Sequence, residues 1–398
     1  MNKFNLLLLA CIFYISNADA QSKHKMSRLI QESFVYADSQ YRYMMTQLPH
    51  GKDMPQRFNL KTNKVEAGPG RSWWCTGFYP GTLAYIYEQT KDPIILKELQ
   101  RALDYIEPNK HFTGNHDLGF MMFNSFGNAY RLNPDQKYKD IIFTSAESLA
   151  KRFIPTVGAT QSWGDYVKSK DVQVIIDNML NLELFLWVAA NGGNPEYRKM
   201  AISHANKTLE NHFRPDYSSY HVVEYDRQTG KVIKKRTHQG YSDDSAWARG
   251  QGWGLYGYTM MYRFTKDQKY LDQAKHIANF ILNHPRLPKD KIPYWDFDSP
   301  DIPNAVRDAS AGALIASGLL ELGQYVDKKE GKLYVKNAAQ MLQSLSSPAY
   351  RPKLGTTGGF LLLHSTGALP LKSEIDIPII YADYYYLEAL KRYKDWYL

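Results

Sequence analysis

The chain contains 398 residues, of which 44% are hydrophobic and 22% are charged. This composition is typical of a globular protein and excludes a disordered or fibrous chain. The formal net charge is +9. Solubility explains such a value by itself, and an excess of positive charge also suits an anionic ligand. The sequence has no Lys/Arg block of the kind found in nucleic-acid-binding proteins, so no nucleic-acid partner is expected.

The N-terminal segment predicts a signal peptide. Lys3 precedes an apolar run over residues 6–15, and residues 18–20 form an A-x-A cleavage site. We predict that residues 1–20 are removed and that residues 21–398 form one exported domain, with the bacterial periplasm as its location. A lipoprotein signal at Cys11 is less favoured because the apolar run continues beyond this cysteine. No later segment approaches the length of a membrane span.

The rest of the chain repeats a pattern of two helices. The first helix of each pair is rich in Gly, Ala and aromatic residues, and an ordinary amphipathic helix follows after a polar turn. In chain order, the first members are expected at residues 77–87, 119–132, 177–190, 248–264, 308–325 and 378–393. Their partners are expected at residues 94–106, 138–153, a segment ending at 213, 270–282 and 333–345, and residues 23–47 complete the sixth pair.

This pattern predicts an all-α fold, an (α/α)6 barrel with six inner and six outer helices. The first helices are apolar nearly all round, as residues 179–187 show, and such helices are buried. An open solenoid is the alternative, but its repeats are short and regular, whereas the spacing here is long and irregular. The only β-structure expected is a small hairpin insertion at residues 221–226 and 231–235.

Unusual polar residues gather just before the inner helices, where the loops of a closed barrel emerge at one end. Asp117 precedes the second inner helix, and a helix-capping role is as reasonable for it as a functional one. Asp177 follows the apolar residues 172–176 and precedes a buried helix. Apolar surroundings raise the pKa of a carboxyl group, so we favour Asp177 as a general acid.

Arg249 lies between Trp247 and Trp253 on a mostly apolar helix, and a buried arginine needs an anionic partner. That partner is either a nearby acid, Asp243 or Asp244, or the carboxylate of a ligand. Cleavage after residue 20 leaves a single cysteine, and the histidines lack ligand spacing. We therefore expect no disulfide, no metal and no cofactor.

Six stretches together resemble the unsaturated glucuronyl hydrolases of glycoside hydrolase family 88: residues 74–78, 116–120, 176–181, 237–251, 307–311 and 382–390. The resemblance implies the (α/α)6 fold and a soluble hydrolase that acts on oligosaccharides left by polysaccharide lyases. Such products carry a 4,5-unsaturated uronic acid at the non-reducing end. Family chemistry hydrates the C4=C5 enol ether of this sugar, which then opens and releases the rest of the chain.

Carried over by position, the resemblance makes Asp177 the general acid/base, while Asp117 orients ring hydroxyls and stabilises the developing cation. It also implies that a set of aromatic and polar residues lines the uronate subsite: Trp74, His221, Thr237, Gln239, Trp247, Arg249 and Trp253. Ser365 and Lys372 are candidates for contact with a sulfate or the next sugar, with a solvated loop as the alternative.

Three other functions are alternatives to this hydrolase. An unsaturated rhamnogalacturonyl hydrolase acting on pectin fragments shares the fold and the chemistry. An acylglucosamine epimerase uses the same barrel but needs histidine pairs on the inner helices, and these are not evident. A non-catalytic oligosaccharide-binding protein would use the aromatic residues without turnover. The preferred glycan stays open among hyaluronan, chondroitin and heparin fragments, as does the oligomeric state.

Overall fold

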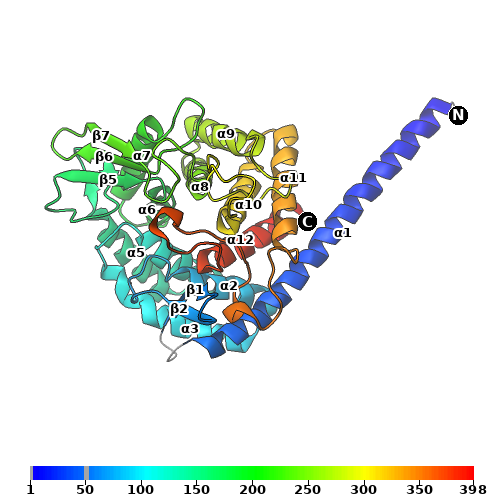
Figure 1. Ribbon diagram of the computed structural model, residues 1–398, viewed down its shortest axis with the longest axis horizontal. Helices are drawn as coiled ribbons and strands as arrows, with labels where there is room; N and C mark the ends of the chain where they lie inside the picture. The colour runs from blue at the N-terminus through cyan, green and yellow to red at the C-terminus, as the bar shows by residue number, and fades with distance from the viewer. Residues whose placement is uncertain (1–2, 49–52) are drawn as a thin grey trace.

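The computed structural model describes residues 3–48 and 53–398, and it is a barrel of two concentric rings of helices (Figure 1). The inner ring contains α2 (Phe78–Thr90), η3 with α4 (Gly119–Gly127 and Asn128–Leu132), α6 (Asn178–Ala190), α8 (Ala248–Thr265), α10 (Ala309–Leu322) and α12 (Ile380–Tyr397). Each inner helix packs against the next, and α12 packs against α2, which closes the ring. The predicted (α/α)6 architecture is confirmed.

The outer ring contains α1 (Lys3–Gln47), α3 (Pro93–Ile106), α5 (Gln136–Ala150), α7 (Glu196–Asn211), α9 (Gln268–Asn283) and α11 (Lys328–Leu345). Short helical turns lie at η2 (Glu107–His111), η4 (Thr357–Gly359) and η5 (Leu369–Leu371). The helix expected at residues 23–47 is part of α1, whose N-terminal half extends away from the barrel (Figure 1). The predicted signal peptide begins at residues 1–2, outside the described residues.

The sequence explains why the two rings differ. Every residue of α10 is buried, as expected for a helix that is apolar all round. The outer helix α9 instead buries one face, which carries Leu271, Ala274 and Ile277. Aspartate side chains accept N–H groups of the first turn in four outer helices and so fix where these helices begin. These residues are Asp92, Asp135, Asp267 and Asp327.

The second inner helix differs from the expected continuous helix over residues 119–132. Gly119–Gly127 is wound as a wider π-helix, and a regular α-helix begins only at Asn128. The Ser125 hydroxyl donates to the carbonyls of Met121 (2.6 Å) and Met122 (3.2 Å), acceptors that regular helical bonding uses. Such windings are frequent at functional sites, and this one begins directly after Asp117 and Leu118.

The β-structure is more extensive than the single hairpin expected. That hairpin is present as β6 (Val222–Asp226) and β7 (Val232–Arg236), but β5 (Asp171–Ile175) pairs with β6 to make a three-stranded antiparallel sheet. Two further hairpins are β1 (Pro55–Asn59) with β2 (Lys64–Ala67), and β3 (Phe153–Ile154) with β4 (Ala159–Thr160). The expectation of one hairpin is wrong because the short apolar strand β5 finds its partner about fifty residues later.

The loops that precede the inner helices are hydrogen-bonded to one another around one end of the barrel. Hydrogen bonds run from the 116 loop to the 162 loop and through β5 and β6. Side chains of His221 and Asp296 then link the 238 loop to β6 and to the 295 segment, and backbone bonds continue through the 306, 364 and 378 segments to β1. Two examples are Ala309 N to His364 O (2.9 Å) and Phe58 N to Pro378 O (3.1 Å). One end of the barrel therefore carries a continuous rim of loops.

Candidate active site

Asp177 lies where strand β5 passes into helix α6. The amide of Ile176 donates to the carbonyl of His221 (3.0 Å), which fixes the backbone just before the aspartate. The Asp177 carboxylate makes no capping bond to α6, and 14% of its side chain is exposed. The carboxylate therefore does not cap the helix, and its oxygens remain available to a ligand.

Asp117 lies at the start of the second inner helix, and 10% of its side chain is exposed. No side-chain cap is present at the start of η3, so the capping alternative considered for Asp117 is wrong. The two aspartates belong to neighbouring helix starts that approach closely, because Gly119 lies directly against Asn181. A Cβ atom on Gly119 would come 2.5 Å from the Asn181 Cα, so only glycine permits this approach.

The electrostatic surroundings keep protons on both carboxyl groups near neutral pH. Burial raises the pKa of Asp177 to about 7, although the positive charge of Arg249 acts in the opposite direction. Burial and then the negative charge of Asp177 raise the pKa of Asp117 to about 8. A carboxyl group that is half protonated at neutral pH can both give and take a proton.

Each aspartate has a neutral histidine beside it. The Nδ1 atom of His221 accepts the backbone N–H groups of His238 and Gln239, both at 3.2 Å, so its ring proton is on Nε2. That Nε2 lies 3.7 Å from Asp177 Oδ1 and has no hydrogen-bond partner among the described residues. Burial lowers the pKa of His221 well below its ordinary value, so the ring stays uncharged.

His116 repeats this arrangement beside Asp117. The Asn181 side-chain oxygen accepts the Phe120 N–H (3.0 Å), which turns the Asn181 amide group toward His116 Nδ1 (3.4 Å). The His116 proton is therefore on Nε2, 3.4 Å from Asp117 Oδ1. Burial lowers the pKa of His116 to about 3. Each carboxylate thus faces a neutral N–H group in place of a positive charge.

Sequence reasoning missed two residues of this cluster, His116 and Trp163. His116 adjoins Asp117 in the chain, but only the fold shows that Asn181 sets its tautomer. Trp163 is half-buried, with its ring 5.0 Å from that of His238 and 6.1 Å from that of His221. No local pattern around Trp163 marks it, because its partners lie far away in the chain.

Arg249 has a partner that the sequence did not identify. Neither Asp243 nor Asp244 pairs with it; its guanidinium donates to Asp308 Oδ2 at 2.7 Å. The same group donates to the carbonyls of Thr366 (2.7 Å) and Gly367 (2.6 Å). Arg249 therefore anchors the loop before α12 and keeps a positive charge near Asp177.

Three other predicted subsite residues, Gln239, Thr237 and Trp247, contact neighbouring parts of the rim. Gln239 donates to the Gly367 carbonyl (3.0 Å), and Thr237 accepts the Gly240 N–H (2.8 Å). The Trp247 ring lies 4.5 Å from the His221 ring, and the Arg249 guanidinium lies 4.5 Å from the Trp247 ring.

The tryptophans predicted for the subsite differ in exposure. Trp74 is half-buried and packs on Tyr381 (5.0 Å) and Phe120 (5.7 Å). The structure places Trp253 differently from the expectation that it faces the ligand. Its ring is fully buried between Phe120 and Tyr385, so it supports the wall of the site from behind.

Ser365 and Lys372 belong to the loop that Arg249 holds. Ser365 is fully buried, and its backbone pairs with Ile377. Its hydroxyl has no hydrogen-bond partner among the described residues. Lys372 is exposed and has a left-handed backbone with φ of 53°. The structure does not bring the two side chains together, and a role in substrate contact stays a prediction for both.

A closed double ring of helices that presents two carboxyl groups of raised pKa at one rim is suited to acid–base chemistry on an extended ligand. The model of Glycosyl Hydrolase Family 88 matches residues 36–396. The chain is 42% identical to an unsaturated glucuronyl hydrolase of Formosa agariphila over 98% of each chain. It is 36% identical to an unsaturated chondroitin disaccharide hydrolase of Streptococcus pneumoniae, over 81% of this chain and 82% of the relative.

Solved structures show the same relationship. An unsaturated glucuronyl hydrolase specific for heparin is similar with a TM-score of 0.88 and 46% sequence identity, covering 92% of this chain and 97% of the other. The enzyme of Bacillus sp. GL1, responsible for the degradation of glycosaminoglycan, has a TM-score of 0.85 at 30% identity, covering 91% and 96%. The chain belongs to Glycosyl Hydrolase Family 88, and it is a glycoside hydrolase.

Proposed function

We propose that the protein releases the 4,5-unsaturated uronic acid from the non-reducing end of glycosaminoglycan oligosaccharides produced by lyases. The observation that carries this proposal is the pair Asp117 and Asp177, two partly exposed carboxyl groups with pKa values raised into the neutral range. The relatives named as unsaturated glucuronyl and chondroitin disaccharide hydrolases support the same substrate class.

The chemistry that suits this pair is hydration of an enol ether. The protonated Asp177 carboxyl gives its proton to C4, and positive charge develops at C5 and the ring oxygen. The resulting carboxylate takes a proton from water, whose oxygen bonds to C5. The hemiketal then opens by breaking the bond between C5 and the ring oxygen. This leaves a hemiacetal at C1 that releases the remaining sugar, and one water is consumed.

The neighbouring groups assist Asp177 in this scheme. The Nε2–H of His221 faces the carboxylate that forms after proton transfer, and a neutral donor stabilises this anion while lowering the pKa of Asp177 less than a positive charge would. Asp117 accepts or donates hydrogen bonds to ring hydroxyls, with the Nε2–H of His116 beside it. The positive charge of Arg249 favours the uronate carboxylate near the same rim.

The test is loss of the conjugated alkene, which absorbs in the near ultraviolet. Unsaturated disaccharides from heparin, chondroitin and hyaluronan, sulfated and unsulfated, are incubated with the protein, and an unsaturated rhamnogalacturonyl disaccharide from pectin serves as the contrasting substrate. We expect turnover of the glycosaminoglycan products, with heparin fragments first, because the heparin-specific structure is the more similar at 46% identity. Turnover of the pectin product alone would replace this proposal with the rhamnogalacturonyl alternative.

We further propose that residues 1–20 are a signal peptide and that residues 21–398 act as one exported domain in the periplasm. The apolar run at residues 6–15 and the A-x-A site support this proposal. In the described part of the chain, no helix combines the length and apolar character that crossing a bilayer requires. Intact mass of the protein from a periplasmic fraction tests it: we expect a chain beginning at Gln21, and an uncut chain in the cytosol contradicts the proposal.

A further inference from the structure

A concave surface lies away from the rim of loops and is lined by residues of α11, the C-terminal end of α12 and Lys23 of α1. These helices lie close together in Figure 1. The concave surface encloses about 1000 Å³. Helix α12 begins at Ile380 beside the rim and continues for 18 residues to Tyr397. At 1.5 Å per residue, this helix places the groove roughly 25 Å from the candidate active site.

The groove is lined by lysines and by no acidic side chain. Lys328, Lys332 and Lys336 lie on one face of α11, with about 6 Å of helix rise between each and the next, and Lys23 adds a fourth ammonium group. All four lysines are exposed. The three on α11 form no ion pair with any acidic side chain that the structure describes.

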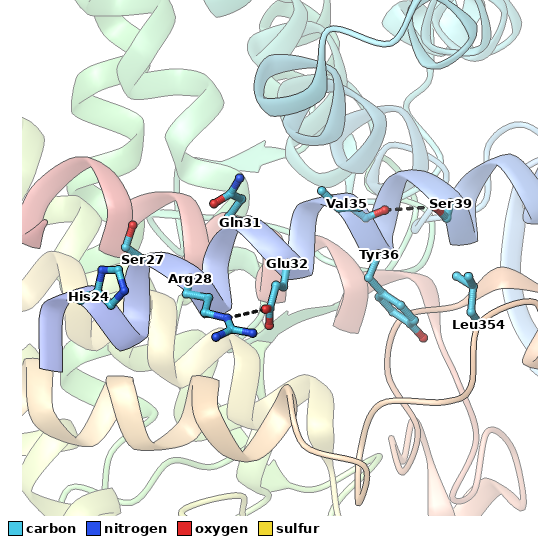
Figure 2. Close-up of a pocket in the computed structure, with 9 residues that line it drawn as sticks. All are labelled: His24, Ser27, Arg28, Gln31, Glu32, Val35, Tyr36, Ser39 and Leu354. Carbon is cyan, nitrogen blue, oxygen red and sulfur yellow. Dashed lines mark hydrogen bonds and ion pairs between the residues drawn. The ribbon is translucent and has the colours of Figure 1, made fainter. Parts of the chain in front are cut away.

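A different groove on the same protein shows what a compensated surface looks like. Figure 2 shows the groove along α1, in which Arg28 is paired with Glu32 at 2.7 Å. The charges of these two residues, which lie about one helix turn apart, neutralise each other. In the lysine groove, three like charges remain side by side, which costs free energy unless an anion binds there.

Aromatic rings complete the lysine groove. Trp396 is 41% exposed, and Tyr393 and Tyr397 line the surface beside it. An exposed indole next to cationic groups offers one flat apolar face and several donors, which matches a sugar ring that carries sulfate or carboxylate groups. Single-stranded nucleic acid uses a succession of aromatic faces, whereas only the Trp396 ring is broadly exposed here.

We propose that this groove is a non-catalytic binding site for a polyanionic oligosaccharide, one that carries sulfate or uronate groups along its length. The lysines of α11 bind the anionic groups, and Trp396 contacts a sugar face. The site would hold a longer glycan chain near an enzyme that acts on chain ends. It does not depend on the proposed reaction, because binding here requires neither Asp117 nor Asp177.

The test uses a heparin octasaccharide from which the terminal unsaturated uronate has been removed, so that the probe is not a substrate. Binding to the full protein is measured by calorimetry at low and at high NaCl. The triple variant Lys328→Gln, Lys332→Gln, Lys336→Gln should bind at least ten-fold more weakly and show a smaller salt dependence. The matched control is Lys97→Gln, Lys151→Gln, Lys231→Gln, which removes the same charge from other exposed positions and should change binding less than two-fold.

Trp396→Ala should weaken octasaccharide binding several-fold while leaving the salt dependence unchanged, since it removes no charge. Turnover of an unsaturated disaccharide should be the same in all of these variants, which separates the groove from the active site. Equal weakening in the control triple variant would overturn the proposal in favour of net charge. Displacement by an unsaturated disaccharide, or tighter binding of oligothymidine or of phosphatidylglycerol vesicles, would overturn it as well.

Discussion

Two of the buried carboxyl groups of the barrel, Glu321 and Asp177, have surroundings that act in opposite ways on their pKa. Away from the rim, Glu321 accepts ion pairs from Arg263 (2.8 Å) and Arg392 (3.0 Å), and its pKa is lowered despite complete burial. At the rim, Asp177 faces a neutral histidine, and its pKa rises to about 7. Burial alone therefore does not set the pKa of a carboxyl group, because a directly paired cation reverses its effect.

Arg249 shows how the rim keeps the pKa of Asp177 raised although a positive charge acts on it. The charge of Arg249 acts on Asp177, yet its guanidinium donates its hydrogen bonds to Asp308 and to two loop carbonyls. A direct salt bridge would hold Asp177 ionised and remove the proton that the reaction needs. The ion pair with Asp308 therefore keeps a positive charge near the site without neutralising the acid.

The largest effect is expected from Asp177→Asn. Turnover of an unsaturated disaccharide, followed by loss of alkene absorbance, should fall by about a thousand-fold or more, because the amide cannot donate the proton. The raised pKa means that the ionised carboxylate opposes folding above about pH 7, so this variant should melt at the same or a higher temperature at pH 8. Full turnover would show that another group is the acid.

The contribution of the ion-paired carboxylate away from the rim is tested by Glu321→Gln, which leaves Arg263 and Arg392 without their shared carboxylate. We expect the free energy of unfolding to drop by about 3–5 kcal/mol in urea denaturation. Turnover per folded molecule should change less than two-fold. The matched control is Glu196→Gln, whose exposed pair with Lys199 should contribute no more than about 1 kcal/mol. Similar losses in both variants would contradict the contrast between the two places.

Gly119→Ala tests the close approach between the two helix starts that carry the aspartates. The new methyl group must displace Asn181, so we expect a stability loss of about 1–3 kcal/mol. Turnover should fall about ten-fold or more, because Asp117 and Asp177 move apart and His116 loses its amide partner. Gly254→Ala is the control for the loss of an inner-helix glycine, since the nearest atom to a Cβ there is Cδ1 of Ile277 at 3.3 Å, the end of a flexible side chain.

The smallest effect concerns the histidine beside the acid. In the wild-type protein, kcat/KM should decline as the pH rises past about 7, because Asp177 must be protonated to act. His221→Phe removes the donor that stabilises the Asp177 carboxylate, so the decline should move to higher pH by less than about one unit. Lower stability alone would reduce activity without moving this profile. A shift to lower pH would contradict the assigned position of the His221 proton.

The sequence predicts the barrel well because its signals are local. Helix periodicity, capping aspartates and apolar inner segments each lie within one or two turns, so the helix pairs and Asp177 could be recognised directly. The partners that complete the site are distant in the chain: Arg249 meets Asp308 59 residues later. Strand β5 was missed for the same reason, since five residues carry too little pattern to indicate their pairing with β6.

The segment of residues 364–376 is held to the barrel partly through main-chain atoms, and this determines which of its side chains can vary. Arg249 and Gln239 donate hydrogen bonds to the main-chain oxygens of Thr366 and Gly367. Such oxygens are present whatever the side chain. Other parts of the segment are fastened by side chains, as the bond from Gln56 to Glu374 (2.6 Å) shows. An exposed residue of the segment such as Lys372 is therefore the kind of position that can vary while Arg249 still holds the loop.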